Sequence, residues 1–311
     1  DDVFASVIGN ASQEIRLNVY EFSSPTMADA LGRARARGVD VLVLVEGGPV
    51  GGIGPEEKTA LWQVNRSGIP VYAMVSSGSV HAPYRYDHAK YVVIDRTAIL
   101  VVSENFKYSG FTPEGKTGNR GWGVVLADPA AASYFASVFL TDIRGPSVVP
   151  YAGEPGRNES PPGEKHAVEF VPQTFVGATV RPVLGPDTSA EIPALINSAG
   201  SSIDIEEAYI TNETQFTLNP YLSAAINASR RGVRVRVLLD SFWYNVEGTN
   251  DNDEMVALIN RIAAAEHLPL EARCAELRTN QIEKIHNKGV IVDGRRVLVS
   301  SINWNSNSPN F

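Results

Sequence analysis

The sequence has few of the features that mark membrane-spanning or disulfide-stabilised proteins. It contains one cysteine, Cys274, among 311 residues, which excludes an internal disulfide bond. No apolar run approaches the ~18 residues that a bilayer-spanning helix needs, so we expect no transmembrane segment. With 43% hydrophobic and 20% charged residues, the composition is that of a soluble globular chain long enough for two domain-sized cores.

Excess positive charge is also missing. The formal net charge is −8, whereas proteins that bind duplex DNA without sequence preference usually present a basic stripe. A cationic cleft within an acidic surface is still compatible with the sequence, because Arg85, Lys107, Arg120 and Lys284 lie close to the motifs described below. The chain begins at Asp1 without a preceding Met, which leaves a processed or secreted form open, and the compartment is not predicted.

Histidine is scarce, and two of the five histidines occupy equivalent positions of a repeat. Residues 88–105 read HAKYVVIDRTAILVVSEN, and residues 286–303 read HNKGVIVDGRRVLVSSIN. A single H-x-K-x-x-x-x-D would be weak evidence, but chance does not readily produce two copies with the same Ser-x-Asn tail. The matched polar residues are His88, Lys90, Asp95, Ser103 and Asn105 in the first copy, and His286, Lys288, Asp293, Ser301 and Asn303 in the second.

Each copy is predicted to form a β-hairpin. β-Branched runs follow the His-x-Lys pair at 91–95 and 289–293, and a second run returns at 98–102 and 296–300. Because residues two apart share a face of a strand, each histidine is expected beside its lysine. Each aspartate lies at an odd offset from the histidine, so we expect its carboxylate to brace the turn.

This pattern resembles the phospholipase D superfamily over nearly the whole chain. The family signature is H-x-K-x-x-x-x-D, present twice in single-chain members and followed by Gly-Ser-x-Asn or a similar segment. The chain departs from it at Val102 and Ser300, which stand where the family usually has Gly, and at Arg96, where Gly commonly follows the aspartate. The resemblance implies an α/β fold class, with two tandem α/β/α domains that have mixed sheets and are related by an internal pseudo-twofold duplication.

The order of predicted elements supports this duplication. IRLNVYEF at 15–22 matches SIDIEEAYI at 202–210, and ARARGVDVLVLV at 34–45 matches ASRRGVRVRVLL at 228–239. Each half therefore contains a βαβαβ-type unit that ends in one motif.

The domain boundaries are predicted from composition. We expect a first half at 1–144, a Pro- and Gly-rich linker at 145–165, and a second half at 166–311. The second half has no counterpart of the strand expected at 121–126 or of the helix expected at 129–139. We therefore expect the natural protein to continue past the last residue given.

The resemblance implies a phosphodiesterase reaction through a phosphohistidine intermediate. The lysines and amides would neutralise phosphate oxygens, while one imidazole attacks phosphorus and the other serves as general acid and then base. As in single-chain relatives, we expect His88 to be the nucleophile and His286 the acid and base. No cluster with metal-ligand spacing lies near either motif, so we expect no cofactor and no metal. The candidate catalytic residues are His88, Lys90, Asp95, His286, Lys288 and Asp293, and the candidate substrate-binding residues are Ser103, Asn105, Ser301, Asn303 and Trp304.

Two further features near the motifs leave alternatives open. Relatives often carry a glutamate in N-x-E-x-G-V that steadies an imidazole, but this chain has Gly121 there, so Glu21, Glu206 and Glu207 are candidates for that role. The glycine-rich loop at 46–55 could cradle phosphate. It lacks a Lys-Ser/Thr ending, and we interpret it as a plain loop near the site.

The substrate is predicted less sharply than the chemistry. Two motifs in one chain and an acidic charge favour hydrolysis or transfer of phospholipid head groups, with peripheral membrane contact. A metal-independent nuclease of the same superfamily is the alternative, because some two-motif relatives cleave nucleic acid and no basic amphipathic helix is obvious. A catalytically silent phosphate-binding module is the third hypothesis. In each case we expect a monomer with pseudo-dimeric halves.

Overall fold

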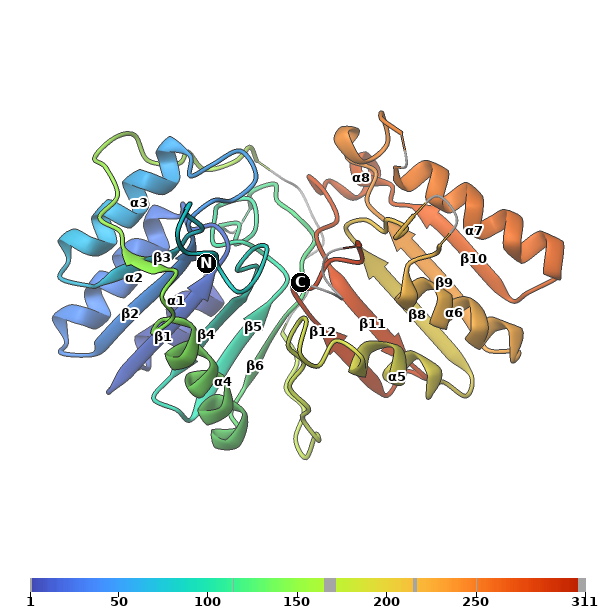
Figure 1. The fold of residues 1–311 in the computed structure, drawn as a ribbon, viewed down its shortest axis with the longest axis horizontal. Helices are drawn as coiled ribbons and strands as arrows, with labels where there is room; N and C mark the ends of the chain where they lie inside the picture. Colours follow the sequence, from blue (N-terminus) through green and yellow to red (C-terminus); the bar gives the residue numbers. More distant parts are fainter. Residues whose placement is uncertain (1, 114, 165–171, 215–216, 250, 307–311) are drawn as a thin grey trace. The chain divides into compact units, whose positions relative to one another are not determined.

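The chain folds into two compact units, each with its own mixed sheet and hydrophobic core (Figure 1). The structure, a computed structural model, describes residues 2–113, 115–164, 172–214, 217–249 and 251–306. Unit 1 takes its residues from 1–118 and 123–181, and unit 2 from 119–122 and 182–311. The predicted fold class, two α/β domains with mixed sheets, is confirmed.

Unit 1 is built on a seven-stranded sheet with the order β6-β5-β4-β1-β2-β3-β7. Strands β1, β2 and β3 are parallel, whereas β4, β5, β6 and β7 each pair antiparallel with their neighbours. The elements are α1 (Asp2–Gly9), β1 (Glu14–Val19), α2 (Pro25–Ala36), β2 (Asp40–Glu46), α3 (Pro55–Arg66), β3 (Val71–Met74), β4 (Lys90–Ile94), β5 (Ala98–Val102), β6 (Gly123–Leu126), α4 (Pro129–Asp142) and β7 (Val148–Pro150).

Local sequence accounts for the helices of unit 1, and burial accounts for their placement. Helix α2 begins with Ser24, whose side chain accepts a hydrogen bond from the backbone N–H of Met27, and α4 begins with the equivalent cap at Asp128. Helices α1, α2 and α3 share one core with the central strands. Helix α4 contacts β4 and β5, and its Phe135 ring lies 5.1 Å from the ring of Tyr91.

The segment predicted as a linker, residues 145–165, lies along unit 1. It contributes strand β7, which pairs antiparallel with β3. Beyond β7, Glu154 N donates to the Lys58 carbonyl at 3.1 Å, and the hydroxyl of Ser23 donates to Glu159 at 2.8 Å. The described part of this segment is therefore fixed by strand pairing and hydrogen bonds.

Unit 2 repeats the central part of unit 1. Its sheet order, β10-β9-β8-β11-β12, has the connectivity and strand directions of β3-β2-β1-β4-β5. Helices α5, α6 and α7 contribute side chains to one core, packed against one face of this sheet. The elements are α5 (Glu191–Asn197), β8 (Ser202–Glu207), α6 (Pro220–Arg230), β9 (Arg234–Leu239), the 3-10 turn η1 (Trp243–Asn245), α7 (Asn252–Glu266), β10 (Leu270–Cys274), α8 (Leu277–Asn280), β11 (Lys288–Val292) and β12 (Arg296–Val299).

Strand register fixes the position of each motif within its unit. Lys90 pairs with Val19, the last residue of β1, and Lys288 pairs with Glu207, the last residue of β8. Both motif strands therefore begin at the carboxyl ends of the parallel strands. This is the edge of an α/β sheet at which ligands usually bind.

The motif aspartates lie at the opposite end of their strands. Asp95 accepts hydrogen bonds of 2.7 to 2.9 Å from the backbone N–H groups of Ser12, Gln13 and Glu14, which lead into β1. Asp293 accepts the same kind of bonds from Gly200, Ser201 and Ser202. Each motif strand begins at the lysine and ends just before the aspartate, five residues later, which puts the two roughly 16 Å apart at about 3.3 Å per residue. The histidine lies two residues further away, so we assign both aspartates a structural role.

Because of these two aspartates, the stability of the fold should decrease at acid pH. Burial raises the pKa of Asp95, but bonds from Glu14, Gln13 and Ser12 outweigh it and lower the pKa below the usual range. Bonds from Ser202, Gly200 and Ser201 lower the pKa of Asp293 more strongly. The stabilisation is present above the unfolded value of about 3.9 and is lost as pH falls through the lower folded value.

We therefore expect Asp293→Asn to melt a few degrees below the wild type at pH 7, with a gap that narrows below pH 4. Circular dichroism melts across this pH range measure the difference. The exposed Asp187 serves as the control, and Asp187→Asn should melt like the wild type throughout. A constant gap between Asp293→Asn and the wild type at every pH would contradict the assignment.

Candidate functional site

The first motif places an imidazole, an ammonium and an aromatic ring together. Lys90, which is 1% exposed, donates from Nζ to the carbonyl of His88 at 3.0 Å, and its Nζ lies 3.3 Å from His88 Nδ1. The ring of Tyr20 lies 4.6 Å from the His88 ring, and Lys90 Nζ lies 5.1 Å from the centroid of Tyr20. The ring face of Tyr20 thus contributes a cation–π contact that helps to hold the buried ammonium.

Tyr20 also connects this motif with the glycine-rich loop. Its hydroxyl accepts a hydrogen bond from the backbone N–H of Val50 at 2.8 Å. Burial raises the pKa of Tyr20 to about 12, so the phenol stays protonated at neutral pH. The loop at 46–55 therefore lies beside the first motif. Tyr20 was not predicted as a site residue, because only the register of β1 and β4 brings it to His88.

The second motif repeats the contact between lysine and histidine carbonyl. Lys288, also 1% exposed, donates from Nζ to the carbonyl of His286 at 2.7 Å. It lies opposite Glu207, which is fully buried. Burial raises the pKa of Glu207 well above its usual value, and the charge of Lys288 acts in the opposite direction. Glu207 therefore lies beside the motif lysine.

Residues 119–122, which precede β6 in sequence, belong to unit 2 and flank its motif. Arg120 N donates to the Lys284 carbonyl, and His286 N donates to the Arg120 carbonyl, both at 2.8 Å. Trp122 packs on Gly289, where an added Cβ would lie 2.3 Å from the indole. The first motif has Tyr91 at this position, so Gly289 provides the space that Trp122 occupies.

Two carboxylates that are not among the predicted site residues hold the backbone just before the motif histidines. Glu46, at the end of β2, accepts from the N–H of Asp87 at 2.6 Å. Asp240, directly after β9, accepts from the N–H of Ile285 at 2.6 Å. Each donor immediately precedes a motif histidine. A signal was present in the sequence, because an acidic residue ends the second parallel strand of both halves.

The second oxygen of each carboxylate also accepts a backbone hydrogen bond, and this bond too is found in both units. Glu46 accepts from Gly48 N at 2.7 Å, and Asp240 accepts from Phe242 N at 3.1 Å, in both cases two residues further along the chain. Burial raises the pKa of both carboxyl groups, and these N–H bonds act in the opposite direction.

The acids that we considered as imidazole partners take different positions. Glu21 accepts from the amide of Asn105, a predicted substrate-binding residue, and pairs with Lys107 at 3.3 Å. Glu206 lies on the face of β8 opposite to that of Glu207, and burial raises its pKa while the charge of Arg120 lowers it. Glu21 thus belongs to the surroundings of the first motif.

The predicted substrate-binding residues of the two tails differ in exposure. Ser103 is fully buried and Asn105 is 8% exposed, whereas Ser301 and Asn303 are half-buried.

In the parts of the chain that the structure describes, no group of three or more His, Cys, Asp or Glu side chains could hold a metal ion. None of the described helices combines the length and apolar character needed to cross a membrane.

Comparison with known proteins identifies the family. The chain matches the family described as cardiolipin synthase, PLD-like domain, over residues 4–143 and 192–310. The chain belongs to the phospholipase D superfamily. Members of this superfamily act on phosphodiesters, and the two matched segments contain one motif each. No protein of curated function matches the sequence.

Comparison with solved structures gives a match in fold over nearly the whole chain and two matches that cover about half of it. Phosphatidylserine synthase from Haemophilus influenzae Rd KW20 matches with a TM-score of 0.67 and 13% identity, covering 99% of this chain and 77% of that one. The phospholipase D family member Nuc from Salmonella typhimurium matches with a TM-score of 0.40 and 23% identity, covering 48% of this chain and 89% of its own. NucT from Helicobacter pylori matches with a TM-score of 0.38 and 14% identity, covering 48% of this chain and 89% of its own.

Trp304, a predicted substrate-binding residue, lies in the core of unit 2. Its side chain is fully buried, with its ring 5.3 Å from that of Tyr221. Its carbonyl accepts from Thr211 N at 2.8 Å, as the carbonyl of Phe106 accepts from Ser23 N at 2.9 Å in unit 1. Trp304 and Phe106 each follow the motif asparagine, so both are core anchors of the repeat.

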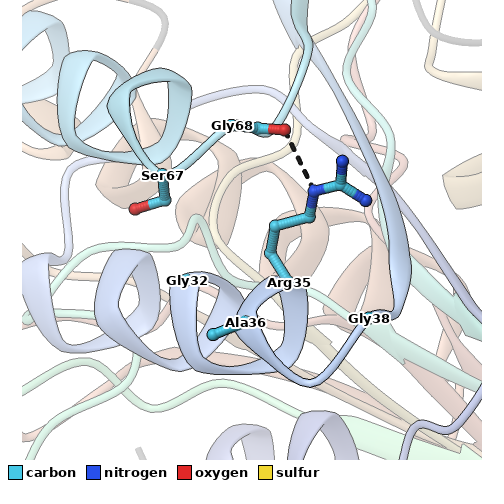
Figure 2. Close-up of a pocket in the computed structure, with 6 residues that line it drawn as sticks. All are labelled: Gly32, Arg35, Ala36, Gly38, Ser67 and Gly68. Carbon is cyan, nitrogen blue, oxygen red and sulfur yellow. Dashed lines mark hydrogen bonds between the residues drawn. The ribbon is translucent and has the colours of Figure 1, made fainter.

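A hollow on unit 1 contains none of the motif residues (Figure 2). It has a volume of about 710 Å³ and lies between the ends of α2 and α3, where Arg35 Nε donates to the Gly68 carbonyl at 3.1 Å. These helix ends lead into the amino ends of β2 and β3, whereas Lys90 lies at their carboxyl ends. We therefore do not place a substrate in this hollow.

The position of Trp304 can be tested through stability. Trp304→Ala should lower the free energy of unfolding by about 3–5 kcal/mol, because it leaves a cavity in the core. Trp304→Phe should cost much less, since Phe106 fills the equivalent place in unit 1. Urea unfolding of the two variants measures both effects. A stable Trp304→Ala variant with a raised KM would instead support contact with substrate.

Proposed function

We propose that this protein is a phosphodiesterase of phospholipase D type that hydrolyses or transfers phospholipid head groups through a phosphohistidine intermediate. One observation carries the proposal. Both motifs are intact, and the same two hydrogen bonds hold each of them. The motif lysine donates to the carbonyl of the histidine, and a carboxylate accepts from the backbone N–H of the residue before the histidine. A degenerate motif that had lost its function would have little reason to keep these buried charges in place.

The proposed reaction uses both motifs on one phosphate. His88 attacks phosphorus, the bond from phosphorus to the leaving oxygen breaks, and His286 gives that oxygen a proton. His286 then takes a proton from water or from an acceptor alcohol, whose oxygen attacks phosphorus and releases His88. Lys90 and Lys288, with Asn105 and Asn303, neutralise the phosphate oxygens throughout. No metal takes part in these steps.

Three observations favour a lipid substrate within this proposal. The chain has both motifs, its net charge is −8, and its fold matches that of a phosphatidylserine synthase over 99% of its length. A metal-independent nuclease is the second candidate, because a polyanion could still bind at the buried lysines. The third candidate is a phosphate-binding module without turnover.

Single histidine variants test whether both motifs serve one reaction. We expect His286→Ala to lose about 10²–10⁴-fold in turnover of a chromogenic phosphodiester, the size of a general acid or base contribution. His88→Ala, which removes the nucleophile, should lose at least as much. The same variants should stop choline release from phosphatidylcholine vesicles. Two independent sites would instead leave about half of the activity in each variant.

His267→Ala is the matched control, because His267 is an exposed residue at the C-cap of helix α7 and belongs to neither motif. It should retain wild-type turnover.

Single-stranded DNA is assayed in parallel, and DNA cleavage that depends on His88 without choline release would overturn the lipid proposal. EDTA is present throughout, so activity that appears only after addition of a divalent ion would contradict the metal-free mechanism.

A further inference from the structure

We propose that Glu46 and Asp240 are positioning residues that fix the backbone at the entry of each motif histidine. The inference rests on the proposed function for its kinetic consequence, and on the hydrogen bonds themselves for its structural one. Neither residue contributes to the H-x-K-x-x-x-x-D pattern or its Ser-x-Asn tail.

The contact is conserved between the two units although the side chains around it are not. The donor is the N–H of Asp87 in unit 1 and of Ile285 in unit 2, so an acidic residue and an apolar residue stand at the same place. The acceptors also differ in length, since one is Glu and the other is Asp. The two units therefore share one hydrogen bond, in which a carboxylate oxygen accepts from the backbone N–H of the residue before the histidine.

Burial shows that these carboxylates need their partners. Glu46 is 6% exposed and Asp240 is fully buried. A buried carboxylate is costly unless hydrogen bonds satisfy it. Each receives two backbone N–H bonds, and Asp240 receives a further bond from the amide of Asn245 at 2.8 Å. The bonds connect the end of the parallel strand, the loop after it and the segment that enters the motif.

Each histidine is consequently held on both sides. The carboxylate binds the N–H one residue before it, and the motif lysine binds its own carbonyl. The imidazole can then turn only about its side-chain bonds. Because a misplacement of about 1 Å can cost 10²-fold in rate, loss of the carboxylate should act on the chemical step.

The test compares the Asp240→Asn variant with the wild-type chain. An amide has one acceptor oxygen, and its NH2 group faces the second N–H, so one of the two backbone bonds is lost. We expect kcat to fall about 10- to 100-fold while KM changes less than about threefold. Hydrogen exchange in a peptide spanning residues 284–288 should be faster, and by more than in peptides of helix α6, which report any general loss of stability that the broken bond causes.

Two further variants separate positioning from general destabilisation. Asp240→Glu keeps the carboxylate, as Glu46 does in unit 1, and should recover part of the lost kcat. Asp204→Asn breaks an ion pair with Arg236 on the same sheet, at 2.6 Å, and should leave kcat and the exchange of 284–288 unchanged. Glu46→Gln tests the same contact in unit 1, through exchange in residues 86–90, if Asp240→Asn fails to fold.

The outcomes distinguish this inference from the proposed function. Unchanged exchange at 284–288 in Asp240→Asn would overturn the positioning role, and so would faster exchange with an unaltered kcat. If the wild type turned over none of the three substrates, the proposed function would fail. The exchange experiment would then still decide whether Asp240 holds the segment.

Discussion

The antiparallel pairing of each motif strand with the first strand of its unit is the constraint on which the site depends. Lys90 opposite Val19, and Lys288 opposite Glu207, place both motifs at the carboxyl ends of the parallel strands. A slip by one residue would turn every side chain of the strand to the other face. The turn aspartate holds one end of the strand, and the Glu46 or Asp240 carboxylate holds the segment that enters the other end.

The two motifs share this backbone scaffold but differ in their neighbours. Tyr20 lies against His88 in unit 1, whereas Ala208 follows the equivalent strand in unit 2. In unit 2, the Trp122 ring instead packs against Gly289, and the Arg120 carbonyl accepts a hydrogen bond from His286 N. Unequal surroundings are what our proposal requires, since one histidine is to attack phosphorus and the other is to transfer protons.

Local patterns predicted much of this organisation. The hairpins at both motifs, the parallel strands and the duplication follow from β-branched runs and from the repeat itself. An acidic residue at the end of the second parallel strand marks Glu46 and Asp240 in both halves. Their contacts, like those of residues 119–122, could not be predicted, because they are hydrogen bonds between segments far apart in sequence. Comparison of the two copies would have placed Trp304 correctly, since Phe106 occupies its position in the first copy.

The central claim is that two motifs in one chain perform one reaction, and active-site titration tests it most directly. A chromogenic phosphodiester mixed rapidly with the enzyme releases its leaving group in a burst as the phosphohistidine forms. The account predicts a burst amplitude of one leaving group per chain, with the phosphoryl group recovered on His88 alone. A burst of two per chain, with adducts on both His88 and His286, would contradict it.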